Sequence, residues 1–163
     1  MNLRVERAVE VLLRNLQRIH ANIMFADRKA GALMAVDSAL LAVIYPLIRK
    51  GETTSQIVVA IISSILLTVG ISVGFAVIRP RGRQNRSRGR GVIDADRIAQ
   101  FENAEAYTTA VSTMSPDAVI EEIQVLTYDY SWIDRQKYKW LRLMVPISGA
   151  GAVSALLTYF WRF

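Results

Sequence analysis

Side chains that could carry out acid–base, nucleophilic or metal chemistry are sparse in this sequence of 163 residues. The chain has one histidine, His20, and no cysteine. No serine is paired with a usable base, and neither a metal-ligand spacing nor a glycine-rich phosphate loop occurs. The carboxylates are spread along amphipathic segments, as expected for solvated faces. The sequence therefore predicts no catalytic residue and no metal site.

Asp37 is the one charged side chain in an otherwise apolar run over residues 30–48. A carboxylate within a membrane segment is costly, and by default it marks an ion pathway or a polar partner. The alternative is that Asp37 lies shallowly enough to be wetted by headgroup water. If Asp37 lines a pore, Asp37→Asn should change cation conductance without changing membrane insertion.

Three apolar runs determine the expected fold class. They cover residues 30–48, 57–78 and 143–161, and the last two contain no charged residue. Each run is close to the roughly 20 residues that cross about 30 Å of hydrocarbon. Buried helices of a soluble bundle are the alternative, but none of the runs has a water-facing stripe. We expect an all-α membrane protein with three transmembrane helices.

Lysine and arginine are distributed unevenly around these runs. Seventeen of the 20 lie before the first run or between residues 79 and 142. Because cytoplasmic segments carry such an excess, the N-terminus and the long central segment are expected in the cytoplasm and the C-terminus outside. The outer loop is too short for a binding domain. Any ligand should therefore be sensed on the cytoplasmic side.

Heptad patterns of apolar residues precede the first and third runs, which is typical of helices that pack along a seam. The first seam consists of Val5, Val9, Leu12, Leu16, Ile19, Ile23, Ala26, Ala30 and Leu33. The second seam consists of Val119, Ile123, Leu126, Tyr130, Ile133, Lys137, Trp140 and Met144. Each pattern continues into its membrane run without a break. We expect two long parallel cytoplasmic helices that form a stalk continuous with two of the transmembrane helices.

Lys137 interrupts the second seam. A lone lysine at such a position usually fixes helix register or oligomer state. Asp27 flanks the first seam and lies within about one helical turn of the same height. We predict that Asp27 and Lys137 pair at the base of the stalk. Charge reversal at both positions should restore the assembly that either single reversal removes.

The segment 79–91 contains six arginines, three glycines and a proline. Three roles are open for it: an anchor on anionic lipid headgroups, an arm that binds the phosphate of a nucleotide, or an arm that binds nucleic acid. A short reach and a lack of aromatic residues for base stacking disfavour the last of these. The segment should not fold by itself.

The chain is expected to contain eight regions. In order, they are the cytoplasmic heptad helix 1–29, transmembrane helix 30–48, the short outer loop 49–56, transmembrane helix 57–78, the basic linker 79–91, short cytoplasmic helices in 92–115, the cytoplasmic heptad helix 116–142 and transmembrane helix 143–161. The short helices should cover 94–101 and about 104–111. In the second transmembrane helix, Gly70 and Gly74 form a small-xxx-small pair that allows close helix approach.

Several short motifs resemble those of the transmembrane effectors of Pycsar, the bacterial pyrimidine cyclase antiphage system. The Ala-Asp-x-Lys-Ala signature is matched by Ala26, Asp27, Lys29 and Ala30 within the run 22–31. Three further matches are Arg79-Pro80, the hydrophobic, acidic and tyrosine pattern over 98–107, and Lys137-Tyr138. The resemblance covers most of the chain in order.

The resemblance implies that a partner cyclase makes cyclic CMP or cyclic UMP on phage infection. The nucleotide would activate this chain, which would impair the bacterial inner membrane and abort the infection. We expect a multi-pass membrane protein that contacts lipids, forms a homo-oligomer, needs no other cofactor and binds no nucleic acid. The alternative is a non-catalytic scaffold subunit that assembles through its cytoplasmic stalk without a ligand.

A cyclic pyrimidine monophosphate needs a cation for its phosphate and a flat surface or hydrogen bonds for its base. Candidates lie at partly matching heights on the two cytoplasmic helices: Arg14, Arg18, Tyr128, Tyr130, Trp132 and Arg135. Core or interface packing is the alternative role for the aromatic members of this set. Nucleotide binding that survives Arg18→Ala and Arg135→Ala together would eliminate the site.

Overall fold

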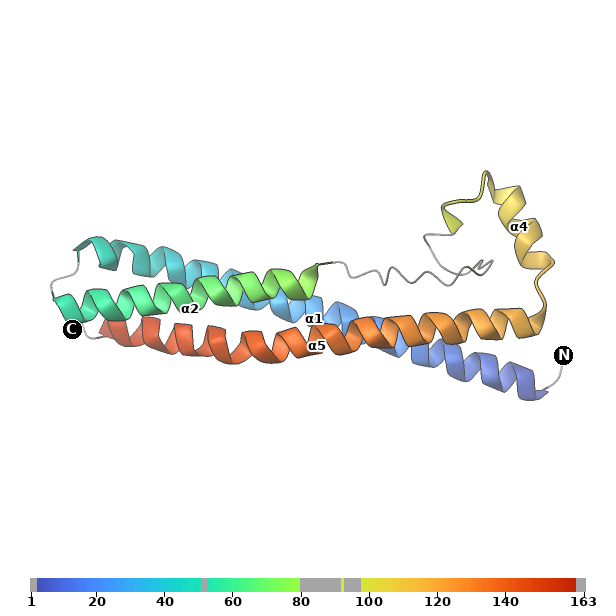
Figure 1. Cartoon of the computed structure of the whole chain (residues 1–163), viewed down its shortest axis with the longest axis horizontal. Helices are drawn as coiled ribbons and strands as arrows, with labels where there is room; N and C mark the ends of the chain where they lie inside the picture. The colour runs from blue at the N-terminus through green and yellow to red at the C-terminus, as the bar shows by residue number, and fades with distance from the viewer. Residues whose placement is uncertain (1–2, 51–52, 80–91, 93–97, 161–163) are drawn as a thin grey trace. The chain divides into compact units, whose positions relative to one another are not determined.

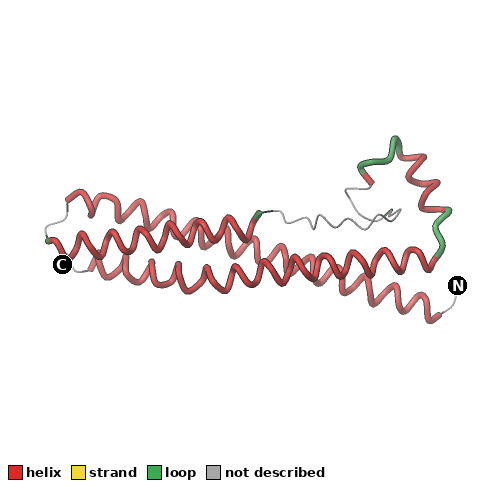
Figure 2. Tube along the Cα trace, viewed as in Figure 1, coloured by secondary structure: helices red, strands yellow, loops and turns green. Residues whose placement is uncertain are grey.

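The computed structural model describes residues 3–50, 53–79, 92 and 98–160. Within these ranges it contains four helices and no strand: α1 (Leu3–Lys50), α2 (Thr54–Ile78), α4 (Ala104–Ser112) and α5 (Pro116–Phe160) (Figure 1). Figure 2 shows that the described loops are short stretches beside these helices. The expected all-α class is confirmed.

Local sequence signals explain where two of the helices begin. The Asn103 side chain accepts a hydrogen bond from the backbone N–H of Ala106 at 2.8 Å and caps α4. Ser115 accepts a hydrogen bond from the N–H of Ala118 at 3.3 Å, just before α5 begins at Pro116. Of the helix expected over 94–101, residues 94–97 lie outside the described residues; among the rest, Ile98 is helical and residues 99–101 form a turn and a bend. The basic linker also lies outside the described residues, apart from Arg79.

The chain divides into two compact units, which are described separately. The head unit combines Met1–Asn22 with Arg81–Asp134, and the bundle unit combines Ile23–Pro80 with Arg135–Phe163. Both α1 and α5 contribute to each unit.

In the head unit, α1 and α5 pack along the positions that repeat every three or four residues. The α1 members are half-buried: Val9, Leu12, Leu16 and Ile19. On α5, Ile123 is buried, and the other members are half-buried: Val119, Leu126, Tyr130 and Ile133. The rings of His20 and Tyr130 meet edge to face, with centroids 6.3 Å apart. This contact joins the two helices beside the seam.

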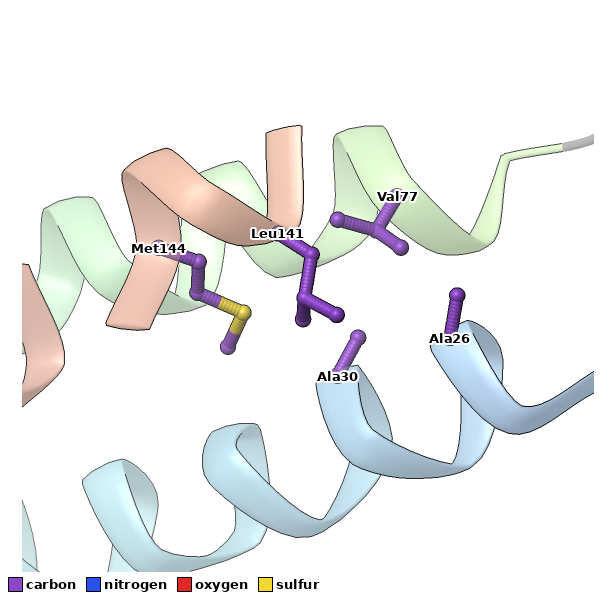
Figure 3. Packing of buried hydrophobic residues seen from close by; sticks show 5 residues of the cluster. All are labelled: Ala26, Ala30, Val77, Leu141 and Met144. Carbon is purple, nitrogen blue, oxygen red and sulfur yellow. The ribbon is translucent and has the colours of Figure 1, made fainter. Parts of the chain in front are cut away.

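In the bundle unit, α1, α2 and α5 pack around two clusters of buried apolar residues. Figure 3 shows the first cluster, which contains Ala26, Ala30, Val77, Leu141 and Met144. The second cluster contains Ile44, Ala60, Leu67 and Ala155. A Cβ atom added to Gly74 would lie 2.5 Å from Cγ of Met34, so this glycine lets α2 approach α1 closely.

The surface of the bundle unit is apolar, whereas part of its interior is polar. Large exposed side chains include Val36, Val43, Ile65, Phe75, Val153 and Leu157. Buried polar side chains include Asp37, Ser63, Ser148 and Thr158. A soluble bundle shows the opposite arrangement, because water favours polar groups outside. Three helices, α1, α2 and α5, are long and apolar enough to cross a membrane, as the sequence predicted.

Candidate functional site

One ammonium group connects all three helices of the bundle unit. The side chain of Lys137 on α5 is 5% exposed, and its Nζ forms an ion pair with Oδ1 of Asp27 on α1. The same Nζ donates a hydrogen bond to the backbone carbonyl of Val77 at 2.9 Å. Val77 lies in the last turn of α2, where carbonyls lack an intrahelical partner. Lys137 therefore pairs with α1 and caps the C-terminus of α2.

The motif that resembles the Pycsar effectors surrounds this contact. Ala26 and Ala30 are fully buried in the first apolar cluster, so the helices can approach closely there. Asp27 pairs with Lys137, and its side chain keeps 36% of its surface exposed. Lys29 is exposed and places its Nζ 4.4 Å from the centre of the Phe25 ring. Three of the four motif residues thus contribute to packing or pairing between helices.

A second polar contact lies deeper in the apolar part of the bundle unit. Asp37 is 1% exposed, and its Oδ2 accepts a hydrogen bond of 2.6 Å from Oγ of Ser148. A Cβ atom on Gly70 would lie 2.6 Å from each of these two oxygens. The missing side chain of Gly70 therefore makes the space for a buried hydrogen bond between α1 and α5. Protein covers Asp37, so headgroup water does not reach it in this arrangement.

The serine hydroxyls of Ser63 and Ser154 form a third polar contact, at 2.5 Å, between α2 and α5. Ser63 also donates to the carbonyl of Val59 at 2.8 Å. Hydrogen bonds between membrane helices are worth roughly 0.6 kcal/mol on average, so such contacts hold helices together without locking them. The inner faces of α1, α2 and α5 thus carry polar groups at several levels.

Asp37→Asn should separate packing from ion passage. Asparagine keeps an oxygen that can accept the hydrogen bond from Ser148, so we expect normal membrane insertion and assembly. If Asp37 lines a pathway when the protein acts, cation conductance of the variant in planar bilayers should fall, because the carboxylate is lost. The matched control is Ser38→Ala, at the exposed neighbouring position. Conductance equal to that of the wild type would eliminate a pathway past Asp37.

Asp134, in the head unit, has a perturbed pKa. Burial raises the pKa of its carboxyl group above the usual value, and a side-chain hydrogen bond with Asn22 opposes this rise. Its Oδ1 atom is buried and has no hydrogen-bond partner among the described residues. Because the folded protein holds this proton more tightly than the unfolded chain does, the contribution of Asp134 to stability is complete below the unfolded pKa. That contribution is lost as the pH rises through the folded pKa.

Asp134→Asn should remove this pH-dependent loss. We expect the melting temperature of the wild type to fall relative to that of the variant as the pH rises from about 4 to about 7. Circular dichroism of both proteins in one detergent measures the difference. Glu102→Gln, in an exposed loop of the same unit, is the control for a general charge effect. A difference in melting temperature between wild type and Asp134→Asn that stays constant with pH would contradict the raised pKa of Asp134.

The residues predicted to bind a nucleotide do not share one face of the head unit. Arg14 and Arg18 on α1 are exposed, as are Tyr128 and Trp132 on α5. Each lies two positions after a seam residue, and two residues rotate a helix by about 200°. The basic and the aromatic members therefore lie on the outer faces of α1 and α5, away from each other.

The two other members of the predicted nucleotide site lie elsewhere. Tyr130 is on the seam, in contact with His20. Arg135 is exposed and belongs to the bundle unit. Among the described residues, no group of three or more His, Cys, Asp or Glu side chains is close enough to hold a metal ion. The described structure thus offers helix contacts and outer charged faces as its candidate functional features.

The sequence did not predict Val77 and Ser148 as partners in the polar contacts, or the space that Gly70 leaves for one of these contacts. The Val77 acceptor is a backbone atom, which leaves no signal in a sequence. Ser148 and Gly70 lie among many small residues of the apolar runs, so their residue types alone do not distinguish them. Gly70 is distinguished by its place among the buried positions of α2. The spacing of those positions, in steps of three and four, is a signal that could have identified the inner face.

Comparison with known proteins assigns the family. A family model described as PycTM, Pycsar effector protein domain, matches residues 11–162. The match covers α2, α4 and α5 completely and most of α1, including the Asp27–Lys137 pair. No curated protein and no solved structure matches the chain. With residues 11–162 matched, the chain belongs to the Pycsar effector protein domain family.

Proposed function

We propose that this protein is a membrane effector of a bacterial antiphage system and that cyclic CMP or cyclic UMP from a partner cyclase activates it. Once activated, it impairs the inner membrane and aborts the infection. The observation that carries this proposal is the family match over residues 11–162 in a chain with three helices able to cross a membrane. The protein acts without a catalytic site of its own.

The proposed topology places the N-terminus and the segment between α2 and α5 in the cytoplasm and the C-terminus outside. The excess of lysine and arginine in these two segments supports it. In this orientation the ligand is received by the cytoplasmic part, and the membrane part responds. A homo-oligomer of the chain acts on the membrane, because buried side chains fill the interior of one bundle.

Activation requires two arrangements of the same chain. A ligand shifts their balance only if it binds one arrangement more tightly than the other. The helices α1 and α5 are long, extending over Leu3–Lys50 and Pro116–Phe160, which supports transmission of a ligand-induced movement along them. The polar contacts of Lys137 and Asp37 are the bonds that such a movement would exchange, because they join different helices.

Isothermal titration of the full chain in detergent tests ligand activation. We expect binding of cyclic CMP or cyclic UMP and at least tenfold weaker binding of cyclic AMP and cyclic GMP, because a pyrimidine site sized for one ring disfavours two. Arg18→Ala with Arg135→Ala should weaken binding, whereas Arg28→Ala, at an exposed position outside the candidate set, should not. Heat with none of the four nucleotides would favour the scaffold alternative.

A further inference from the structure

The outer faces of α1 and α5 in the head unit carry two contrasting rows of exposed residues. The basic row on α1 consists of Arg7, Val11, Arg14 and Arg18. The acidic–aromatic row on α5 consists of Asp117, Glu121, Val125, Tyr128 and Trp132. Both rows advance in steps of three and four residues, so each forms one stripe along its helix. Each stripe lies about 200° from the seam, so the two rows point to opposite sides of the helix pair.

Single exposed apolar residues are ordinary, but these rows combine exposed apolar area with opposite charge. Val11 is 57% exposed and Tyr128 is 63% exposed. Two members of the α5 row are acidic, Asp117 and Glu121, and none is basic, whereas three members of the α1 row are arginines. Among the described residues, Arg14 forms an exposed ion pair with Glu10 on its own helix, and such a pair is exchanged at little cost. The two rows are therefore complementary in charge, and one chain cannot bring them together.

The register of the head unit places two complementary pairs at the same levels. His20 contacts Tyr130, and Asn22 bonds to Asp134, so a residue of α1 lies level with the α5 residue about 110 positions later. On this register Arg7 is level with Asp117, and Arg18 is level with Tyr128. An arginine at an aromatic face gains a cation–π contact in addition to its charge interactions.

We propose that the basic row of one copy packs against the acidic–aromatic row of a second copy of this chain, and that the nucleotide site is completed only at this contact. The second part rests on the proposed function. Copies embedded in one membrane share one depth, so Arg7 meets Asp117 and Arg18 meets Tyr128 of the neighbour. The contact joins two different surfaces, so its repetition generates a ring if the rotation between copies closes and an open row of copies if it does not.

The same contact supplies what a cyclic pyrimidine monophosphate needs. Arg14 and Arg18 of one copy present cations for the phosphate, and Tyr128 and Trp132 of the other present flat surfaces for the base. One copy alone offers either the cations or the aromatic rings on a given side. A ligand that bridges them stabilises the assembled form, so nucleotide binding and assembly are coupled.

Disulfide crosslinking tests the contact between copies without reference to any ligand. The chain contains no cysteine, so Arg7→Cys with Asp117→Cys introduces the only thiols. In liposomes under oxidising conditions, the full-length variant should give a ladder of covalent oligomers on a non-reducing gel, with or without nucleotide. The control pair, Gln17→Cys with Ser131→Cys, is exposed but lies off both rows and should remain largely monomeric. A row pair that crosslinks no more than the control overturns the proposal.

Mixing two defective variants tests whether the site is shared. Arg14→Ala with Arg18→Ala disables the basic row, and Tyr128→Ala with Trp132→Ala disables the aromatic part of the other row. Neither variant alone should bind cyclic CMP or cyclic UMP. In an equal mixture that assembles at random, about a quarter of the contacts join an intact basic row to an intact aromatic row. The mixture should therefore recover about a quarter of the sites. No recovery overturns the shared site. A wild type that binds neither nucleotide refutes the proposed function, while the crosslinking result still decides the contact between copies.

Discussion

Lys137→Met should destabilise the bundle unit by about 3 kcal/mol, the lower end of the range for breaking a buried ion pair. The loss of the ammonium group leaves two acceptors without their donor, the Asp27 carboxylate and the Val77 carbonyl. Methionine fills a similar volume, so packing changes little. Asp27 is partly exposed and can regain water, which keeps the loss at the lower end. Unfolding of the purified protein in mixed micelles measures the difference.

The matched control is Lys139→Met, two residues away on the same helix. Lys139 is exposed, so its loss should change stability by less than about 0.5 kcal/mol. Equal losses for Lys137→Met and Lys139→Met would contradict the role of the buried ammonium group.

Charge reversal of the pair gives a second readout at the same contact. Asp27→Lys or Lys137→Glu alone should abolish assembly, because each buries like charges against one another. Both together restore the ion pair but place a carboxylate beside the Val77 carbonyl, which now lacks its donor. The double variant is therefore expected to restore assembly only in part, whereas the sequence alone predicted full restoration. A double variant as defective as either single variant would count against the pairing.

Gly70→Ala should cost about 1 to 3 kcal/mol, the usual range for overpacking a tight core. The added methyl group would lie 2.6 Å from Oδ2 of Asp37 and from Oγ of Ser148, so it must displace a buried hydrogen bond. A shift of α2 away from α1 and α5 is the other way to make space. The same unfolding measurement detects either outcome.

Gly149→Ala is the control for the added methyl group. Gly149 follows Ser148 on α5, and a Cβ atom there would have nothing within 4 Å. Alanine replaces glycine in a helix with a gain of up to about 1 kcal/mol, so this variant should be neutral or more stable. A Gly70→Ala protein that is as stable as Gly149→Ala would show that the small residue at position 70 is not required.

Much of the helical architecture could be predicted because the patterns involved are strong and long. The apolar runs correspond to three helices able to cross a membrane, and the seam residues whose side chains are described are buried or half-buried in both units. Asp27 and Lys137 could be paired because Lys137 interrupts the second seam and Asp27 flanks the first seam at about the same height. The start of the helix at residue 116 could be predicted as well, because a local cap such as Ser115 needs only its own neighbours.

Other features were beyond the sequence because they depend on how the helices are rotated. Arg18 and Tyr128 were predicted to share a site from their matching heights, but height fixes only the position along an axis. The angular positions of these residues on α1 and α5 place them on opposite sides of the helix pair. Those angles are fixed only when the contacts between the two helices are known. The sequence likewise could not distinguish Ser148 from the other small residues of its run, because its contact with Asp37 depends on how the helices pack.

The central claim is that a cyclic pyrimidine nucleotide turns this protein into an agent that impairs membranes. Release of a trapped dye from liposomes that contain the purified full chain tests it most directly. Cyclic CMP or cyclic UMP should trigger release, while cyclic AMP, cyclic GMP and protein-free liposomes should give none. Liposomes that stay sealed with every nucleotide, or that leak equally without one, would contradict the account.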